Sequence, residues 1–132
     1  MYEVRWIIQN RVVLLYTGSH LVMEDNVEIN HQVEVLLNEV NHPVHLISDT
    51  SELKSFPINV VKLIEVYSFL KHPNFEIGVQ VSSSPMIRFL TRAITRPFKS
   101  YPFKIVASRE EALELLYQLD ETLAPEPDTV AE

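Results

Sequence analysis

The chain has 132 residues, a hydrophobic fraction of 46% and a formal net charge of −7. This length fits one domain around a single core, the apolar content excludes an intrinsically disordered chain, and the acidic charge argues against general binding to nucleic acid or anionic membranes. The chain contains no cysteine, which excludes disulfides and thiolate chemistry. Its longest apolar run, Val12 to Tyr16, is too short to span a membrane, so we expect a cytoplasmic protein.

Strands and helices are expected to alternate along the chain. Two β-rich segments flank a tight turn at Gln9-Asn10, and later helices end where His42-Pro43 and His72-Pro73 push the backbone out of helical geometry. In chain order the expected elements are strands at 3–9 and 11–17, a helix at 21–41, a strand at 44–48, a helix at 58–70, a strand at 75–81, a helix at 86–96, a strand at 103–107 and a helix at 109–119.

Two helix starts carry clear local signals. Ser84 is a helix cap, and Pro85 follows it at a position where its missing N–H does no harm. Ser108 to Glu111 has the sequence of a capping box. The order ββαβαβαβα predicts an α/β fold with one mixed, mostly parallel sheet packed against helices. We expect a single domain over 1–120 and a disordered acidic tail over 121–132.

Three glycine-containing motifs that are common in α/β enzymes are missing from the chain. Its only glycines are Gly18 and Gly78, which excludes the P-loop, the dinucleotide-binding motif and the nucleophile elbow, although a nucleophile outside these motifs stays open. His42 and His45 point to opposite faces of a strand, so they cannot share a metal ion with Asp49 unless the backbone bends. We therefore expect no enzyme activity, no metal site and no cofactor.

The polar loop that follows the strand at 44–48 is a candidate binding site. It contains Asp49, Ser51 and Ser55 and lies at the carboxyl end of a central strand, where open α/β sheets commonly bind ligands. The alternative is that Asp49 and Ser51 only cap the loop.

The order of elements over 3–119 and the Asp-x-Ser pattern at Asp49 resemble the STAS domain, the fold of bacterial anti-sigma-factor antagonists. In those antagonists the loop continues to Asp-Ser-Ser-Gly or Asp-Ser-Thr-Gly, whose serine is phosphorylated by a partner kinase. The corresponding positions here are Pro57-Ile58-Asn59-Val60. The resemblance therefore implies the fold and a partner-binding surface without a serine-phosphorylation switch. Lipid-binding CRAL-TRIO relatives of the fold imply apolar small molecules as alternative ligands.

The helix expected at 58–70 has apolar residues on two faces. One face is a plausible core stripe, whereas Ile58, Val61, Val66 and Phe69 fall on the side that should meet water. Either a loop or the tail covers this side, or a few exposed apolar residues are tolerated, or it binds another protein chain. The expected partner-binding residues are Asp49, Ser51, Ser55, Ile58, Val61 and Phe69.

The segment from Ile77 to Arg109 is basic and contains no acidic residue. Arg88, Arg92 and Arg96 follow one another at four-residue spacing beside Phe89, while Met86, Ile87, Leu90 and Ile94 take the other side of the helix. With Ser84 at the positive end of the helix dipole, this edge is a candidate anion-binding site. The alternative is a solvated face whose arginines pair with acids of the same protein or a second copy.

The function that these features favour is a non-catalytic, STAS-like regulatory or protein-interaction domain. Its partner is another protein or a second copy of the chain. The alternative is a binding protein for a small apolar or anionic ligand. An enclosed cavity of about 300 Å³ or more would favour the ligand, and a flat face centred on Phe69 would favour a protein partner.

Overall fold

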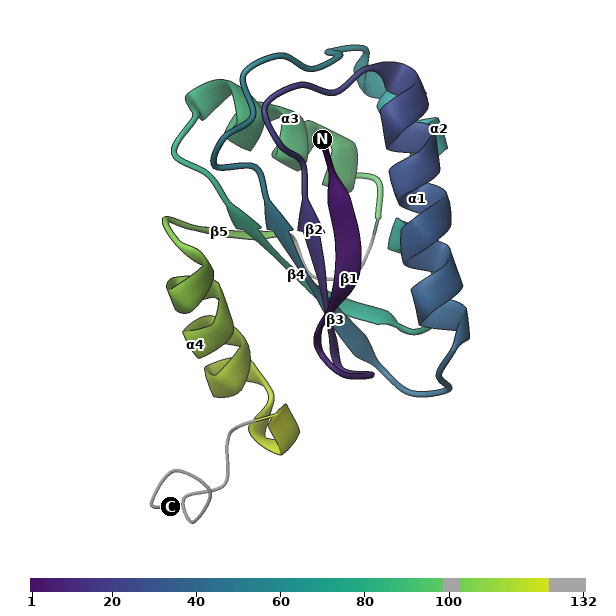
Figure 1. Cartoon of the computed structure of the whole chain (residues 1–132), viewed down its shortest axis with the longest axis vertical. Coiled ribbons are helices and arrows are strands. Elements are labelled where there is room, and N and C mark those ends of the chain that lie inside the picture. Colours follow the sequence, from purple (N-terminus) through teal and green to yellow (C-terminus); the bar gives the residue numbers. More distant parts are fainter. Residues whose placement is uncertain (99–102, 124–132) are drawn as a thin grey trace.

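A five-stranded sheet forms the middle layer of the protein. Figure 1 shows the computed structural model, which describes residues 1–98 and 103–123. The strands follow the spatial order β1-β2-β3-β4-β5, with β1 antiparallel to β2 and the remaining neighbours parallel. The mixed, mostly parallel sheet predicted from the sequence is confirmed. The strands are β1 (Glu3–Ile8), β2 (Val12–Tyr16), β3 (Val44–Asp49), β4 (Phe75–Val81) and β5 (Lys104–Val106).

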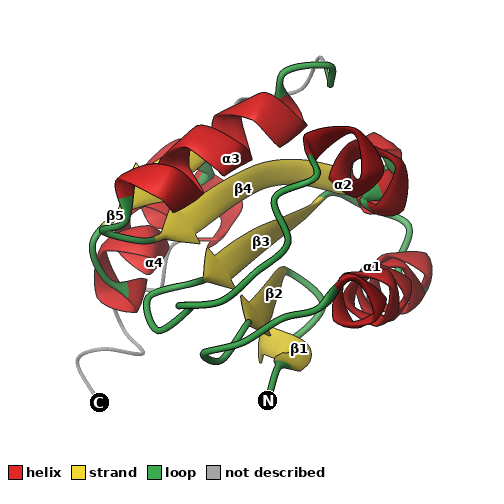
Figure 2. Cartoon of the chain, turned by 90° about the horizontal axis from the view of Figure 1, so that it is seen from above, coloured by secondary structure: helices red, strands yellow, loops and turns green. Residues whose placement is uncertain are grey.

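Helices cover both faces of the sheet, as Figure 2 shows from above. One face carries α1 (Met23–Asn38), α2 (Val60–Val66), the 3₁₀ helix η1 (Ser68–Lys71) and α3 (Pro85–Thr95); the other carries α4 (Arg109–Leu119) and the 3₁₀ helix η2 (Glu121–Leu123). Every residue of β3 is buried because the strand is central and covered on both sides. Within 1–98 and 103–123, no helix is long and apolar enough to cross a membrane.

The local signals in the sequence form the expected structures. Asn10 adopts a left-handed φ of 64° in the hairpin turn. Ser84 caps α3, and Ser108 caps α4 by accepting a hydrogen bond from the Glu111 backbone N–H at 3.2 Å. The Glu111 carboxylate accepts a hydrogen bond from the backbone N–H of Ala107, one residue before the cap, at 3.3 Å, so only the serine half of the predicted capping box forms. Both helices therefore begin where their caps predict.

The prediction of a continuous helix at 58–70 is wrong, because the helix is interrupted at Tyr67. There φ is −88° and ψ is 60°, and the next residues form η1. A 3₁₀ turn has three residues instead of 3.6, so the faces of the two segments no longer align. Phe69 consequently turns inward and is 3% exposed, with its ring edge-on to Tyr67 and Phe75. Its expected place on the outer face is therefore wrong.

Asn30 on α1 holds the break in position. Its side-chain oxygen accepts a hydrogen bond from the Phe69 backbone N–H at 2.9 Å, and its side-chain nitrogen donates to the Ser68 hydroxyl at 3.1 Å. A buried asparagine in a helix needs such partners. The conformation of η1 thus depends on a residue 39 positions earlier in the chain.

The disordered tail was predicted to begin at residue 121, which is too early, because residues 121–123 form η2. Leu123 is buried against the core beneath α4. The Thr122 hydroxyl accepts a hydrogen bond from Arg11 at 2.7 Å. The rest of the predicted tail, 124–132, lies outside the described residues.

Removing residues 121–132 should lower the melting temperature, whereas loss of a disordered tail would leave it almost unchanged. Loss of Leu123 burial and of the contacts to Arg11 costs about 2 kcal/mol, which corresponds to roughly 6–10 °C in a domain of this size. The measurement is thermal unfolding followed by circular dichroism. A chain that ends at Leu123 is the control, and equal melting temperatures for the two truncated chains would contradict the role of η2.

Candidate functional site

Asp49 fixes the loop that follows β3. One of its carboxylate oxygens accepts hydrogen bonds from the Ser51 backbone N–H at 3.0 Å and the Ser51 hydroxyl at 2.6 Å, and the other accepts from Arg109 Nε at 2.6 Å. Burial disfavours the charged form, but the hydrogen bonds from Ser51 and Arg109 outweigh burial and lower the pKa of Asp49. Since Asp49 is buried and paired, its predicted role in contacting a partner is wrong, and the capping interpretation describes it.

The remainder of the loop is anchored to the segment before α1. The backbone N–H of Leu21 donates to the Ser55 carbonyl at 2.8 Å, and the N–H of Ser55 donates to the Ser19 carbonyl at 3.1 Å. Ser51 and Ser55 are both exposed. They therefore lie at the surface on a loop of defined shape, and contact with a partner stays a prediction for both.

The start of α2 places two apolar side chains in solvent. Asn59 caps the helix by accepting a hydrogen bond from the Lys62 backbone N–H at 3.1 Å. Leu63 faces the core, whereas Ile58 and Val61 are exposed on the opposite side. The structure thus places these two residues where the sequence analysis expected them.

The start of α3 contributes two more exposed apolar residues. Ile87 and Leu90 are buried, but Met86 and Phe89 face solvent. Met86 was expected on the side of the helix away from the arginines, with Ile87 and Leu90, yet it is exposed, because helical spacing defines a face without defining how far neighbouring elements cover it. We call Ile58, Val61, Met86 and Phe89 the α2–α3 apolar surface; they are 66%, 70%, 53% and 63% exposed.

The basic edge of α3 lies beside this surface. Arg88, Arg92 and Arg96 are all exposed. The Ser84 hydroxyl accepts a hydrogen bond from the backbone N–H of Ile87 at 3.3 Å, so it serves the helix as a cap. Anion binding at this edge stays a prediction, and Lys99, which belongs to the same basic segment, lies outside the described residues.

A small cavity lies between the sheet and the layer formed by the loop, α2, η1 and α3. Its volume is about 120 Å³, and its walls include Leu63 and Leu90. A polar chain also borders it: Thr91 donates a hydrogen bond to Gln80, which donates to the Thr50 hydroxyl at 3.2 Å. The volume is below the roughly 300 Å³ at which pockets for drug-sized ligands begin.

Solved structures of bacterial proteins are similar in fold to this chain. A structure of an uncharacterized protein of the DUF3478 family with a SpoIIAA-like fold, from Shewanella loihica PV-4, is 17% identical, with a TM-score of 0.62 over 88% of this chain and 92% of that one. The unphosphorylated anti-sigma factor antagonist SpoIIAA is 12% identical, with a TM-score of 0.62 over 89% and 97%. The phosphorylated form of SpoIIAA, described as a Bacillus cell fate determinant, is 11% identical, with a TM-score of 0.57 over 88% and 99%.

These similarities define the fold of the chain. No protein-family profile and no curated protein matches its sequence. The chain has the SpoIIAA-like fold, and the STAS resemblance seen in the order of its elements is confirmed at the level of the fold. At the edge of the sheet where the parallel strands end, the structure brings together the loop after β3, the exposed start of α2 and the start of α3.

Proposed function

We propose that the chain is a non-catalytic, cytoplasmic regulatory domain that binds another protein. The contact surface is the α2–α3 apolar surface together with the exposed serines of the loop after β3. The observation that carries this proposal is the placement of exposed apolar side chains. Apart from Met1, the four members of the surface are the most exposed large apolar residues in the part of the chain that the structure describes.

The positions of these residues favour a common surface. Helices α2 and α3 pack beside each other, and both contribute inward residues to the wall of the same cavity. Ile58, Val61, Met86 and Phe89 lie on these two helices or directly before them and point to solvent. Single exposed apolar residues are common, whereas several on adjacent elements mark interaction sites. A partner that covers them removes apolar area from water and gains stability from it.

The charges beside this surface favour an acidic partner. Arg88 and Arg92 are exposed next to Phe89, in a segment from Ile77 to Arg109 that has no acid to neutralise them. Complementary charge around an apolar contact speeds association and selects among partners. We therefore propose a partner segment that carries both carboxylates and apolar side chains.

The proposed binding does not use phosphorylation of a serine at the start of α2. The sequence there is Pro57-Ile58-Asn59-Val60, which offers no hydroxyl group. SpoIIAA has been solved in a phosphorylated and in an unphosphorylated form. In this chain a contact made by Ile58 would be controlled by the amount or state of the partner.

The experiment that tests this proposal compares the proteins retained from cells of the source organism by the immobilised chain and by its variant V61E/F89E. The proposal expects a specific protein, or a second copy of the chain, to be retained by the wild type and lost with the variant. The V27E variant is the matched control, because Val27 is an exposed apolar residue on α1. Equal retention by all three chains would contradict the proposal.

Reversing the charge of the basic edge should slow association with the partner. The double variant R88E/R92E should lower the association rate about tenfold at low salt and flatten its dependence on ionic strength, because salt screens the attraction between exposed charges. Stopped-flow or biosensor kinetics at several salt concentrations measures this, with K71E, at an exposed residue of η1, as the control. If neither the rate nor its salt dependence changes, the arginines form only a solvated face.

The small cavity suggests a second candidate, the binding of a small apolar ligand, although its volume is below that of pockets for drug-sized ligands. At about 120 Å³ it can hold only a few heavy atoms unless the helices above it move apart. Native mass spectrometry of the chain as purified from its source tests this candidate. A bound molecule of defined mass would support ligand binding, and its absence together with partner retention would support the first function.

A further inference from the structure

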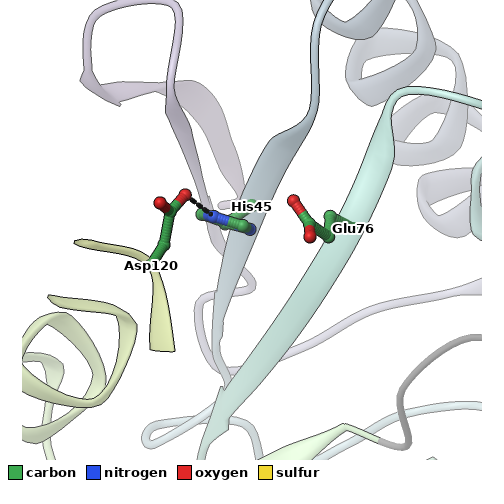
Figure 3. Close-up of side chains that lie close together, drawn as sticks. All are labelled: His45, Glu76 and Asp120. Carbon is green, nitrogen blue, oxygen red and sulfur yellow. Dashed lines mark hydrogen bonds and ion pairs between the residues drawn. The ribbon is translucent and has the colours of Figure 1, made fainter. Parts of the chain in front are cut away.

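A β-bulge places a carboxylate beside a buried histidine, at the end of the sheet opposite to the loop after β3. In the pairing of β3 with β4, Val44 lies opposite Phe75 and Leu46 opposite Gly78. His45 therefore faces two residues, Glu76 and Ile77, instead of one. Bulges re-aim side chains and are common beside functional sites. Here the extra residue turns Glu76 toward the α4 face of the sheet, on which His45 also lies (Figure 3).

His45 is paired on one side only. It is 1% exposed, and its Nε2 lies 2.8 Å from a carboxylate oxygen of Asp120. Its Nδ1 is buried and has no hydrogen-bond partner among the described residues. Buried polar atoms in folded proteins nearly always have a partner, and an exception points to an ion or a water at that place. Figure 3 shows the imidazole between the carboxylates of Asp120 and Glu76.

Asp120 is held in place as an ionised group. Its second oxygen accepts hydrogen bonds from the Thr122 hydroxyl at 2.6 Å and the Thr122 backbone N–H at 3.0 Å, while Arg11 lies 3.2 Å from the oxygen that faces His45. Hydrogen bonds from the Thr122 hydroxyl and from His45 lower the pKa of Asp120 to about 2.

We propose that His45, Glu76 and Asp120 bind a divalent transition-metal ion such as Zn²⁺. Their nitrogen and oxygen ligand atoms all lie within 4.8 Å of one another. Ligand atoms around a tetrahedral zinc ion are roughly 3.4 Å apart, so binding of an ion requires the side chains of Asp120 and of the half-buried Glu76 to adjust. One imidazole with two carboxylates is a donor set that suits zinc and its neighbours in the transition series.

Two of the three proposed ligands, Glu76 and Asp120, border an open depression at the protein surface. An open depression of about 660 Å³ is lined by Arg11, His42, Glu76 and Asp120, among others. Asp120 can share the ion with His45, or it can accept the remaining ring N–H of a metal-bound His45, as carboxylates behind zinc-bound histidines do. His45 thus has metal-binding neighbours other than the His42 and Asp49 considered from the sequence, and they come from β4 and the end of α4.

The test is titration of the full chain, without a polyhistidine tag and freed of metal by a chelator, with Zn²⁺ in a calorimeter. We expect one saturable site per chain. The E76Q variant keeps the shape of the side chain and removes a ligand, so it should bind Zn²⁺ at least tenfold more weakly. The E24Q variant is the matched control and should bind like the wild type, because Glu24 is an exposed residue of α1 away from the cluster.

Two further readouts separate this site from metal held loosely by surface histidines. Co²⁺ should give visible absorption bands with the wild type that weaken in E76Q, and Zn²⁺ should raise the melting temperature of the wild type but not of E76Q. Circular dichroism without metal shows whether E76Q is folded. Absence of saturable one-to-one binding to the wild type, or equal affinity of wild type and E76Q, would overturn the proposal.

Discussion

The F69E variant is expected to unfold the domain. Phe69 is buried between α1 and the sheet and packs edge-on against Phe75, at 5.4 Å between ring centres. Truncating such a side chain costs about 3–5 kcal/mol, and a buried unpaired carboxylate adds to that cost. Since whole domains are stable by only about 5–15 kcal/mol, most of the stability is lost. Thermal unfolding followed by circular dichroism measures this directly.

The V61E variant is the matched control for this result. It introduces the same charge into the neighbouring helix α2, at a side chain that faces solvent. Its melting temperature should stay within about 3 °C of the wild type, since surface substitutions change stability by about 0.5 kcal/mol or less. A folded F69E chain with a similar melting temperature would show that Phe69 is not part of the core.

The V61E/F89E variant should lose at least 100-fold in affinity for the partner while remaining folded. Both residues lie on the α2–α3 apolar surface, and a charge placed within the contact leaves a carboxylate desolvated and unpaired. A factor of 100 corresponds to about 2.8 kcal/mol, or about 1.4 kcal/mol for each substitution. Equilibrium binding to the purified partner, by calorimetry or biosensor, measures the change.

Two controls make this affinity measurement specific. The single variants V61E and F89E should each weaken binding about tenfold, and V27E on α1 should leave it unchanged. A double variant that binds as tightly as the wild type would place the contact elsewhere on the molecule. Loss of binding in V27E as well would show that added negative charge, and not the position, causes the effect.

Features that depend on neighbouring residues could be predicted from the sequence. Asn10 in the hairpin turn and the caps Ser84 and Ser108 each act within a few residues, so their side chains decide the local backbone. The alternation of strands and helices then limits the topology to a mixed sheet covered by helices. The exposure of Ile58 and Val61 could also be expected, because helical spacing is a local property of the sequence.

Features that depend on distant residues could not be predicted in this way. The carboxylate of the buried Asp49 is paired with Arg109, which lies 60 positions later in the chain. Phe69 turns inward because Asn30 binds its backbone and the helix breaks at Tyr67. Helical spacing alone shows neither the break nor the partner. The end of the chain was likewise misjudged, since the burial of Leu123 depends on the core beneath α4.

Photo-crosslinking in living cells tests the α2–α3 apolar surface as a contact site most directly. The photoreactive residue p-benzoylphenylalanine would replace Val61 or Phe89, and in a separate control Glu110, which is exposed at the start of α4 on the other face of the sheet. We predict one defined crosslinked protein from positions 61 and 89 and none from position 110. No crosslink from 61 and 89, or the same products from all three positions, would contradict the account.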